Sequence, residues 1–139
     1  MGLIAIDPGA CSGFGYFEKG VLVNCGVFDP KKSCRPYFGE GGIVIERPQI
    51  YVSRPVDSNA LITLAILVGR FSEWYESKGC TVEHVLPHAW KGNLDKGMCW
   101  RRTKPKLSLE ELHVLPKVAK TYTHNMYDAI GIGLWKLDR

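Results

Sequence analysis

The sequence lacks the features that mark several specialised classes of protein. It contains no internal repeat, no low-complexity run and no block of acidic residues, which excludes a solenoid, a collagen-like chain and a disordered tail. The longest nearly apolar stretch, residues 60–69, is about half as long as a membrane-spanning helix must be. No basic segment of the kind that begins a signal peptide precedes the first apolar run. We therefore expect a protein that neither crosses a membrane nor is targeted to one.

The cysteines lack the close spacing that is typical of zinc sites and redox-active dithiols. Their number is odd, and no C-x-x-C pair is present among Cys11, Cys25, Cys34, Cys80 and Cys99. We expect free thiols in a reducing cytoplasm, with one or two of them buried as small apolar side chains.

The positive charge is concentrated in one part of the chain. The 139 residues, 45% of them hydrophobic, are enough for one compact domain with its own core, and the net charge is +4. Residues 86–120 carry eight Lys and Arg side chains against three acids. Trp90 and Trp100 lie among them, and Tyr122 follows shortly after the segment. Cations beside aromatic rings can contact phosphates and stack on bases. The segment therefore predicts a nucleic-acid partner, although a solvated loop has a similar composition.

The first part of the chain predicts a sheet. The apolar run at residues 3–6 is typical of a strand buried on both faces, and residues 13–18 and 21–28 predict two further strands joined by a tight turn. These strands form an antiparallel meander. After a loop over residues 29–42, rich in Pro, Gly and Lys, residues 43–45 predict a fourth buried strand.

A long amphipathic helix is predicted over residues 59–77. Apolar residues recur there at helical spacing, and residues 57–59 offer an N-cap. A second apolar row consists of Ala60, Ile66, Leu67 and Trp74, so the helix is either enclosed in the core or shared with a second subunit. We favour the second arrangement, in which Leu67 and Trp74 are exposed until a partner covers them.

The remaining elements complete an α/β fold. Residues 81–86 predict a strand and residues 87–92 a short turn or helix. A capping box that begins at Ser108 predicts a brief helix, and Thr123 is expected to cap a last helix over residues 124–137. The whole pattern predicts a mixed sheet with an antiparallel meander, flanked by helices.

Acidic side chains follow two of the predicted buried strands. Asp7 ends the first strand and Glu46 ends the fourth, while Asn125 and Asp128 lie three residues apart on one face of the last helix, with His124 nearly on that face. Each residue alone has an ordinary alternative role in a turn, an ion pair or a helix end. Together they predict a site for hard cations such as Mg²⁺, for which Mn²⁺ can substitute. Two such ions would activate water and stabilise the leaving oxygen of a phosphodiester.

Several segments of the chain carry a resemblance to a known family. They are residues 4–9 with Gly13 and Gly15, residues 43–46, residues 90–91 and residues 128–134. Together they resemble RuvC-type Holliday junction resolvases of the RNase H-like superfamily, across nearly the whole chain. The small size and the Trp-Lys-Gly sequence at residues 90–92 resemble small phage members of that family, which implies a bacterial or phage-infected host cell.

The resemblance implies a fold, an activity and a site. It implies an α/β, RNase H-like nuclease domain over residues 1–139 that acts as a homodimer on Holliday junctions or other branched DNA. In the mechanism that we favour, Asp7 bridges two Mg²⁺ ions, Glu46 and Asp128 each hold one, and Asn125 or His124 completes the site. The residues expected to contact DNA phosphates are Lys91, Lys96, Arg101, Arg102, Lys104 and Lys106.

The chain departs from the family pattern at Asn125. The family usually has Asp or His at this position, and Asn supplies an amide oxygen but no charge and no base. Three alternatives remain open: Asn125 suffices, His124 takes its place, or the protein binds branched DNA and cleaves it poorly.

Overall fold

The protein contains a five-stranded mixed sheet in the order β3-β2-β1-β4-β5. The computed structural model describes residues 2–32, 34–51, 57–92 and 96–139, with side chains for all of these except residues 96–98. The strands are β1 (Gly2–Asp7), β2 (Ser12–Glu18), β3 (Val21–Phe28), β4 (Gly41–Glu46) and β5 (Thr81–Val85). The first three form the predicted antiparallel meander, and β4 and β5 run parallel to β1.

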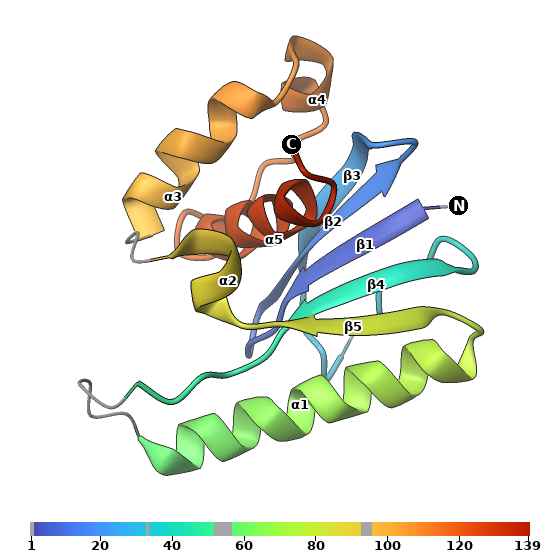
Figure 1. The fold of residues 1–139 in the computed structure, drawn as a ribbon, viewed down its shortest axis with the longest axis vertical. Helices are drawn as coiled ribbons and strands as arrows, with labels where there is room; N and C mark the ends of the chain where they lie inside the picture. The colour runs from blue at the N-terminus through green and yellow to red at the C-terminus, as the bar shows by residue number, and fades with distance from the viewer. Residues whose placement is uncertain (1, 33, 52–56, 93–95) are drawn as a thin grey trace.

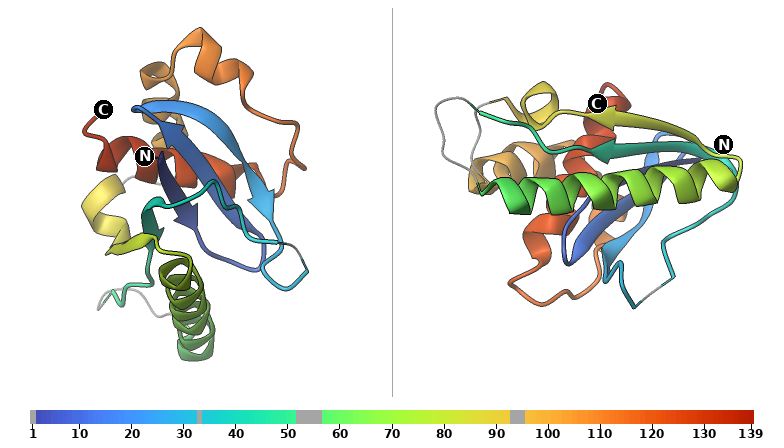
Figure 2. Two further views of the ribbon diagram at one scale, coloured as in Figure 1. Left: turned by 90° about the vertical axis from the view of Figure 1, so that its right-hand side faces the viewer. Right: turned by 90° about the horizontal axis from the view of Figure 1, so that it is seen from below.

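Helices cover both faces of this sheet (Figures 1 and 2). The helix α1 (Ser58–Ser77) lies along one face, and α5 (Thr123–Lys136) crosses the other. On the side of α5 lie α2 (Pro87–Lys91), α3 (Lys96–Thr103), the 3₁₀ turn η1 (Lys104–Lys106) and α4 (Leu109–His113). The predicted α/β architecture of a mixed sheet between helices is confirmed.

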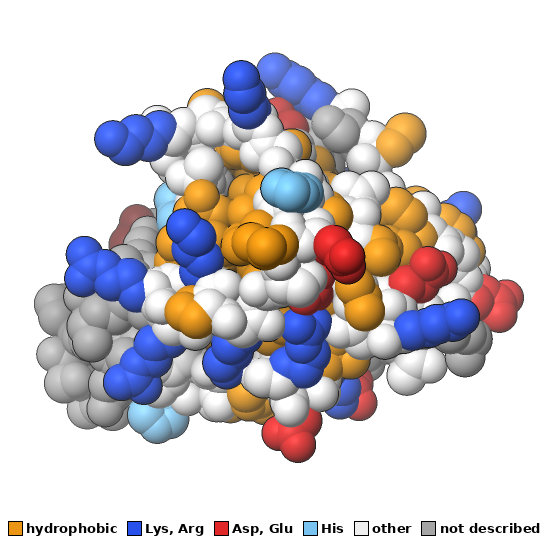
Figure 3. Space-filling model, turned by 90° about the horizontal axis from the view of Figure 1, so that it is seen from above, with side chains coloured by type: hydrophobic (Ala, Val, Ile, Leu, Met, Phe, Trp, Pro, Cys, Tyr) orange, Lys and Arg blue, Asp and Glu red, His pale blue; other side chains and the backbone are white. Residues whose placement is uncertain are grey.

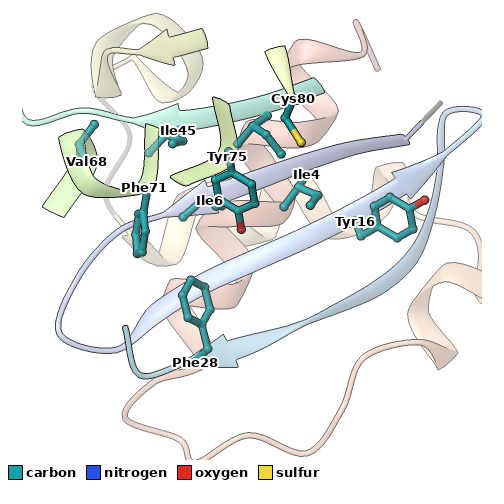
Figure 4. Close-up of a cluster of buried hydrophobic side chains, with 10 residues drawn as sticks. Ile4, Ile6, Tyr16, Phe28, Ile45, Val68, Phe71, Tyr75 and Cys80 are labelled. Atoms are coloured by element: carbon teal, nitrogen blue, oxygen red, sulfur yellow. The ribbon is translucent and has the colours of Figure 1, made fainter. Parts of the chain in front are cut away.

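The alternation of side chains along β1 and β4 divides the core into two layers. Ile4 and Ile6 point toward α1, where they pack with residues of that helix, whereas Ala5 points toward α5. Figure 4 shows Phe71 and Tyr75 projecting from α1 toward the strands. The buried cluster on this side consists of Ile4, Ile6, Tyr16, Phe28, Ile43, Ile45, Val68, Phe71, Tyr75 and Cys80.

Only part of the second apolar row predicted for α1 is exposed, namely Ala60 and Ile66. Leu67 and Trp74 are half-buried and pack against the α1 cluster. The Arg35 guanidinium carbon lies 5.5 Å from the centroid of the Trp74 ring, so the loop before β4 helps to cover this side chain. Ile62 and Ile66, one turn apart, are instead 57% and 59% exposed. The expectation that Leu67 and Trp74 are exposed is therefore wrong, because the buried stripe is rotated relative to the predicted one.

The predicted helix starts are confirmed in two cases and wrong in one. The Asp57 side chain accepts from the Asn59 N–H at the start of α1, and Ser108 forms the expected capping box with Glu111. Thr123 is already inside α5, and its hydroxyl donates to the Lys120 carbonyl instead of capping the helix. Tyr122 is the N-cap residue instead, and it makes no side-chain hydrogen bond to the helix.

No helix in the described part of the chain is long and apolar enough to cross a membrane. None of the five cysteines forms a disulfide, and three of them are buried: Cys25, Cys80 and Cys99.

An ion pair between Arg139 and the buried carboxylate of Glu111 links the chain after the end of α5 to α4 and β3. The Arg139 guanidinium donates to both carboxylate oxygens of Glu111 at 2.9 Å, and Glu111 is only 3% exposed. Glu111 also accepts from the backbone N–H groups of Leu22 and Ser108. The Arg139 hydrogen bonds hold the pKa of Glu111 at about 2, below its ordinary value of 4.5. The pair therefore joins α5 to β3 and α4.

We predict that Arg139→Gln lowers the free energy of unfolding at pH 7 by about 2–3 kcal/mol, because it leaves a buried carboxylate without its charge partner. The native pKa of Glu111 is depressed, so its stabilisation is present above pH 4.5 and is lost as pH falls toward 2. Urea unfolding at pH 7 and pH 3 measures both effects, and the variant should lose much less stability between these pH values than the wild type.

The matched control is Lys136→Gln, which removes the exposed ion pair between Lys136 and Glu83. This change should cost less than about 1 kcal/mol, since exposed pairs contribute little. Equal losses from the two variants would contradict the role of the buried pair.

Candidate active site

Asp7 and Glu46 lie side by side at the carboxyl ends of two parallel strands. Ile6 pairs with Ile45 in the register of β1 with β4, so the next residue of each strand is a neighbour across a spacing of about 4.8 Å. Alternation places both carboxylates on the α5 side of the sheet. The sequence prediction that these two acids meet at one edge agrees with this placement.

The start of α5 lies against the same edge. Gly13 pairs with Asp7 across β1 and β2, and a Cβ atom at Gly13 would overlap the Asn125 carbonyl group. The Asn125 side-chain amide donates to the Cys11 carbonyl at 2.9 Å. This hydrogen bond uses the amide nitrogen of Asn125 and leaves its oxygen for another partner. Asn125 is thus fixed over the turn that joins Asp7 to β2.

The remaining predicted residues of the site also belong to the start of α5. Asp128 is buried, with 7% of its surface exposed, one helical turn after Asn125. His124 precedes Asn125 and is half-buried.

The groups around the Glu46 carboxyl shift its pKa in opposite directions. Burial raises its pKa above the ordinary value, the Trp90 hydrogen bond and the Lys91 charge lower it, and the negative charge of Asp128 raises it. The opposition of Asp128 means that the two carboxylates interact across the space between β4 and α5. Such repulsion between buried acids is what a bound cation relieves.

Trp90 is a partner of Glu46 that the sequence did not reveal. Its indole N–H donates to the Glu46 Oε2 atom at 2.5 Å. The two residues are 44 positions apart, and the sequence suggested Trp90 as a surface for stacking bases. A half-buried indole needs an acceptor for its N–H, but nothing in the pattern identifies Glu46 as that acceptor.

The donor chemistry fits a hard cation, but the side chains do not converge in this structure. Asp7, Glu46, Asp128 and the Asn125 amide supply oxygen atoms of the type that Mg²⁺ prefers. Within the residues that the structure describes, however, no three His, Cys, Asp or Glu side chains form a group that could hold a metal ion. Glu46 and Asn125 instead make the hydrogen bonds to Trp90 and Cys11.

The predicted DNA-binding cations lie on the α5 side of the molecule, and Figure 3 shows Lys and Arg side chains spread over the surface seen from above. Lys91, Arg102 and Lys106 line a cavity of about 590 Å³ between α2, α3 and α5. Lys106 also donates to the Arg139 backbone carbonyl. Arg101 and Lys104 are exposed, and the side chain of Lys96 lies outside the described residues.

Two of the three aromatic residues in or beside the basic segment are engaged within the protein. The Trp100 ring stacks on Tyr127 with centroids 3.7 Å apart and planes inclined by 3°. Trp90 is bonded to Glu46, whereas Tyr122 is 43% exposed. Trp100 and Trp90 therefore have partners within the protein, and base stacking by these rings stays a prediction.

Solved structures of RuvC have the same fold as this chain. T. thermophilus RuvC in complex with Holliday junction substrate matches with a TM-score of 0.65 and 18% identity, over 97% of this chain and 92% of that chain. The Thermus thermophilus RuvC structure matches with a TM-score of 0.58 and 19% identity, over the same shares of the two chains. Neither a protein-family model nor a curated protein matches this chain. The predicted RuvC-type, RNase H-like fold is confirmed, whereas the likeness to phage members stays a prediction.

Proposed function

We propose that this chain is a Mg²⁺-dependent endonuclease that cleaves Holliday junctions or other branched DNA. The observation that carries the proposal is the pairing of Asp7 with Glu46 at adjacent strand ends, with Asp128 acting electrostatically on Glu46 from α5. The neighbouring structure of T. thermophilus RuvC with a Holliday junction substrate supports branched DNA as the substrate class.

The acids of the site hold the cations. Asp7, Glu46, Asp128 and the amide oxygen of Asn125 are the proposed ligands, and Mn²⁺ is expected to substitute for Mg²⁺. When bound, two such ions supply an activated water and charge stabilisation for the departing oxygen of a phosphodiester. The protein side chains orient these groups and balance their charge.

Cations around the site hold the DNA backbone. Lys91 acts on Glu46 electrostatically and also lines the cavity that Arg102 and Lys106 share. Lys96, Arg101 and Lys104 complete the set of proposed phosphate contacts on α3 and η1. Such contacts fix the position of the duplex without reading its sequence.

We predict that Asp7→Asn reduces the cleavage of a four-way junction by far more than tenfold and leaves junction binding intact or stronger. The variant loses a proposed metal ligand, whereas the basic surface is unchanged. Nicking in Mg²⁺ and gel-shift binding measure the two effects on the same substrate.

The control is Asp57→Asn, which keeps an oxygen at the N-cap of α1 and should cleave normally. Retention of more than about a tenth of the rate by Asp7→Asn would contradict the assignment, since a metal ligand contributes more than about 1.4 kcal/mol.

A second candidate is a protein that binds junctions and cleaves them poorly. Two observations favour it: Asn125 brings no charge to the site, and the acids do not converge in this structure. Tight junction binding by the wild-type protein, with no cleavage in either Mg²⁺ or Mn²⁺, would support this candidate.

We predict that Asn125→Asp preserves or raises the cleavage rate because it adds a charged ligand, whereas His124→Ala changes the rate less than about threefold. Asn125 is favoured because it is hydrogen-bonded over the turn beside Asp7. Single-turnover cleavage measures both rates. A large loss in His124→Ala with an indifferent Asn125→Asp would assign the role to His124.

The active form is proposed to be a homodimer. Symmetric resolution of a four-way junction requires two cuts, and one acidic site supplies one. Ile62 and Ile66 present exposed apolar surface on α1, on the opposite side of the sheet from the candidate site. We assign the dimer contact to this face of α1.

We predict that the wild-type chain is a dimer at micromolar concentration and that Ile66→Glu is a monomer, because a charge is costly in an apolar contact. Light scattering over a dilution series measures the mass. Leu109→Glu is the control, since Leu109 is 76% exposed on α4, and it should remain dimeric. A monomeric wild type, or a dimeric Ile66→Glu, would refute this interface.

A further inference from the structure

We infer that Trp90 is a positioning residue for the proposed cation site, which holds the Glu46 carboxylate by one oxygen and presents the other to the metal. The inference rests on the proposed function, because it assigns a role to Trp90 in that same site. Trp90 itself touches neither the metal nor the DNA in this role. It acts through Glu46.

The hydrogen bond from Trp90 gives the two carboxylate oxygens of Glu46 different roles. The Trp90 indole N–H donates to Oε2 of Glu46, so Oε1 is the oxygen that can face a cation. Indole nitrogen is a donor only, which makes the contact favourable when the carboxylate is ionised.

The indole ring is held in place by packing on the three strands β1, β4 and β5 and on α5. Trp90 packs against a buried cluster of four small or branched side chains: Ala5, Val44, Val85 and Ile132. A Cβ atom at Gly131 would lie 2.7 Å from the Trp90 ring, so glycine is needed there for the ring to occupy its position. The Lys91 ammonium lies 5.3 Å from the centroid of the same ring.

Through the Trp90 ring, the position of α5 affects the position of Glu46, the proposed metal ligand at the end of β4. Gly131 lies in α5 one turn after Asp128, and its missing side chain sets how closely Trp90 approaches the helix. The ring in turn sets the position of Glu46 at the end of β4. Carboxylates that bind metals are commonly oriented by such outer hydrogen bonds, and loss of one partner typically costs about 10- to 100-fold in metal affinity.

Two substitutions test the inference, one by removing the hydrogen-bond donor and one by displacing the ring that carries it. Trp90→Phe keeps an aromatic ring and removes the donor, and Gly131→Ala keeps the donor and displaces the ring. Both should weaken Mn²⁺ binding, measured calorimetrically without DNA, by about tenfold or more. The controls are Trp135→Phe, which removes an indole that is 41% exposed, and Gly69→Ala, where a Cβ meets nothing within 4 Å. Neither control should change the affinity more than about twofold.

The wild-type protein provides a readout that no change in folding can disturb. The indole ¹H–¹⁵N signal of Trp90 should shift on addition of Mg²⁺, whereas the Trp135 signal should not. Tight Mn²⁺ binding by the wild type with unchanged affinity in both Trp90→Phe and Gly131→Ala would overturn the positioning role and leave the proposed function intact. Failure of the wild type to bind Mn²⁺ would overturn both.

Discussion

The close packing of α5 on β1 and β2 is the constraint on which the candidate site depends. Residues 128–134 of α5 are buried without interruption, so the helix is enclosed between the sheet and α3. Glycine makes this approach possible at two points: a Cβ at Gly13 would overlap the backbone of Asn125, and one at Gly133 would overlap the Phe17 ring. A side chain at either position would force α5 away from the sheet. Asn125 and Asp128 would then move away from the strand ends.

The same packing concentrates negative charge where solvent has little access. Burial raises the pKa of Glu46, and the negative charge of Asp128 raises it further. Trp90 and Lys91 act in the other direction and keep the Glu46 carboxylate ionisable. A site of this kind gains electrostatic free energy when a divalent cation binds, because the ion neutralises repulsion that the fold imposes. The positions of these acids thus support the proposed cation site.

The sequence predicted the elements whose signals are local. The apolar run before Asp7, the capping box at Ser108 and the amphipathic pattern of α1 each depend on neighbouring residues, and the structure confirms the elements they predict. The predictions failed where distant contacts decide. The side of α1 that is buried depends on which strands and loops pack against the helix. The hydrophobic periodicity of the helix carries no information about those partners. Likewise, the bond between Trp90 and Glu46 joins residues that only the assembled sheet brings together.

We propose that Asp7, Glu46 and Asp128 together hold divalent cations at this edge of the sheet. The most direct measurement is anomalous scattering from crystals grown with Mn²⁺, which locates the ion independently of activity. We expect Mn²⁺ peaks between these acids, with Asp7 carboxylate oxygens within about 2.5 Å of two ions, Glu46 within that distance of one ion and Asp128 of the other. The Asn125 amide oxygen should lie beside them. Crystals saturated with Mn²⁺ that show no ion between these residues, or an ion held elsewhere, would contradict the account.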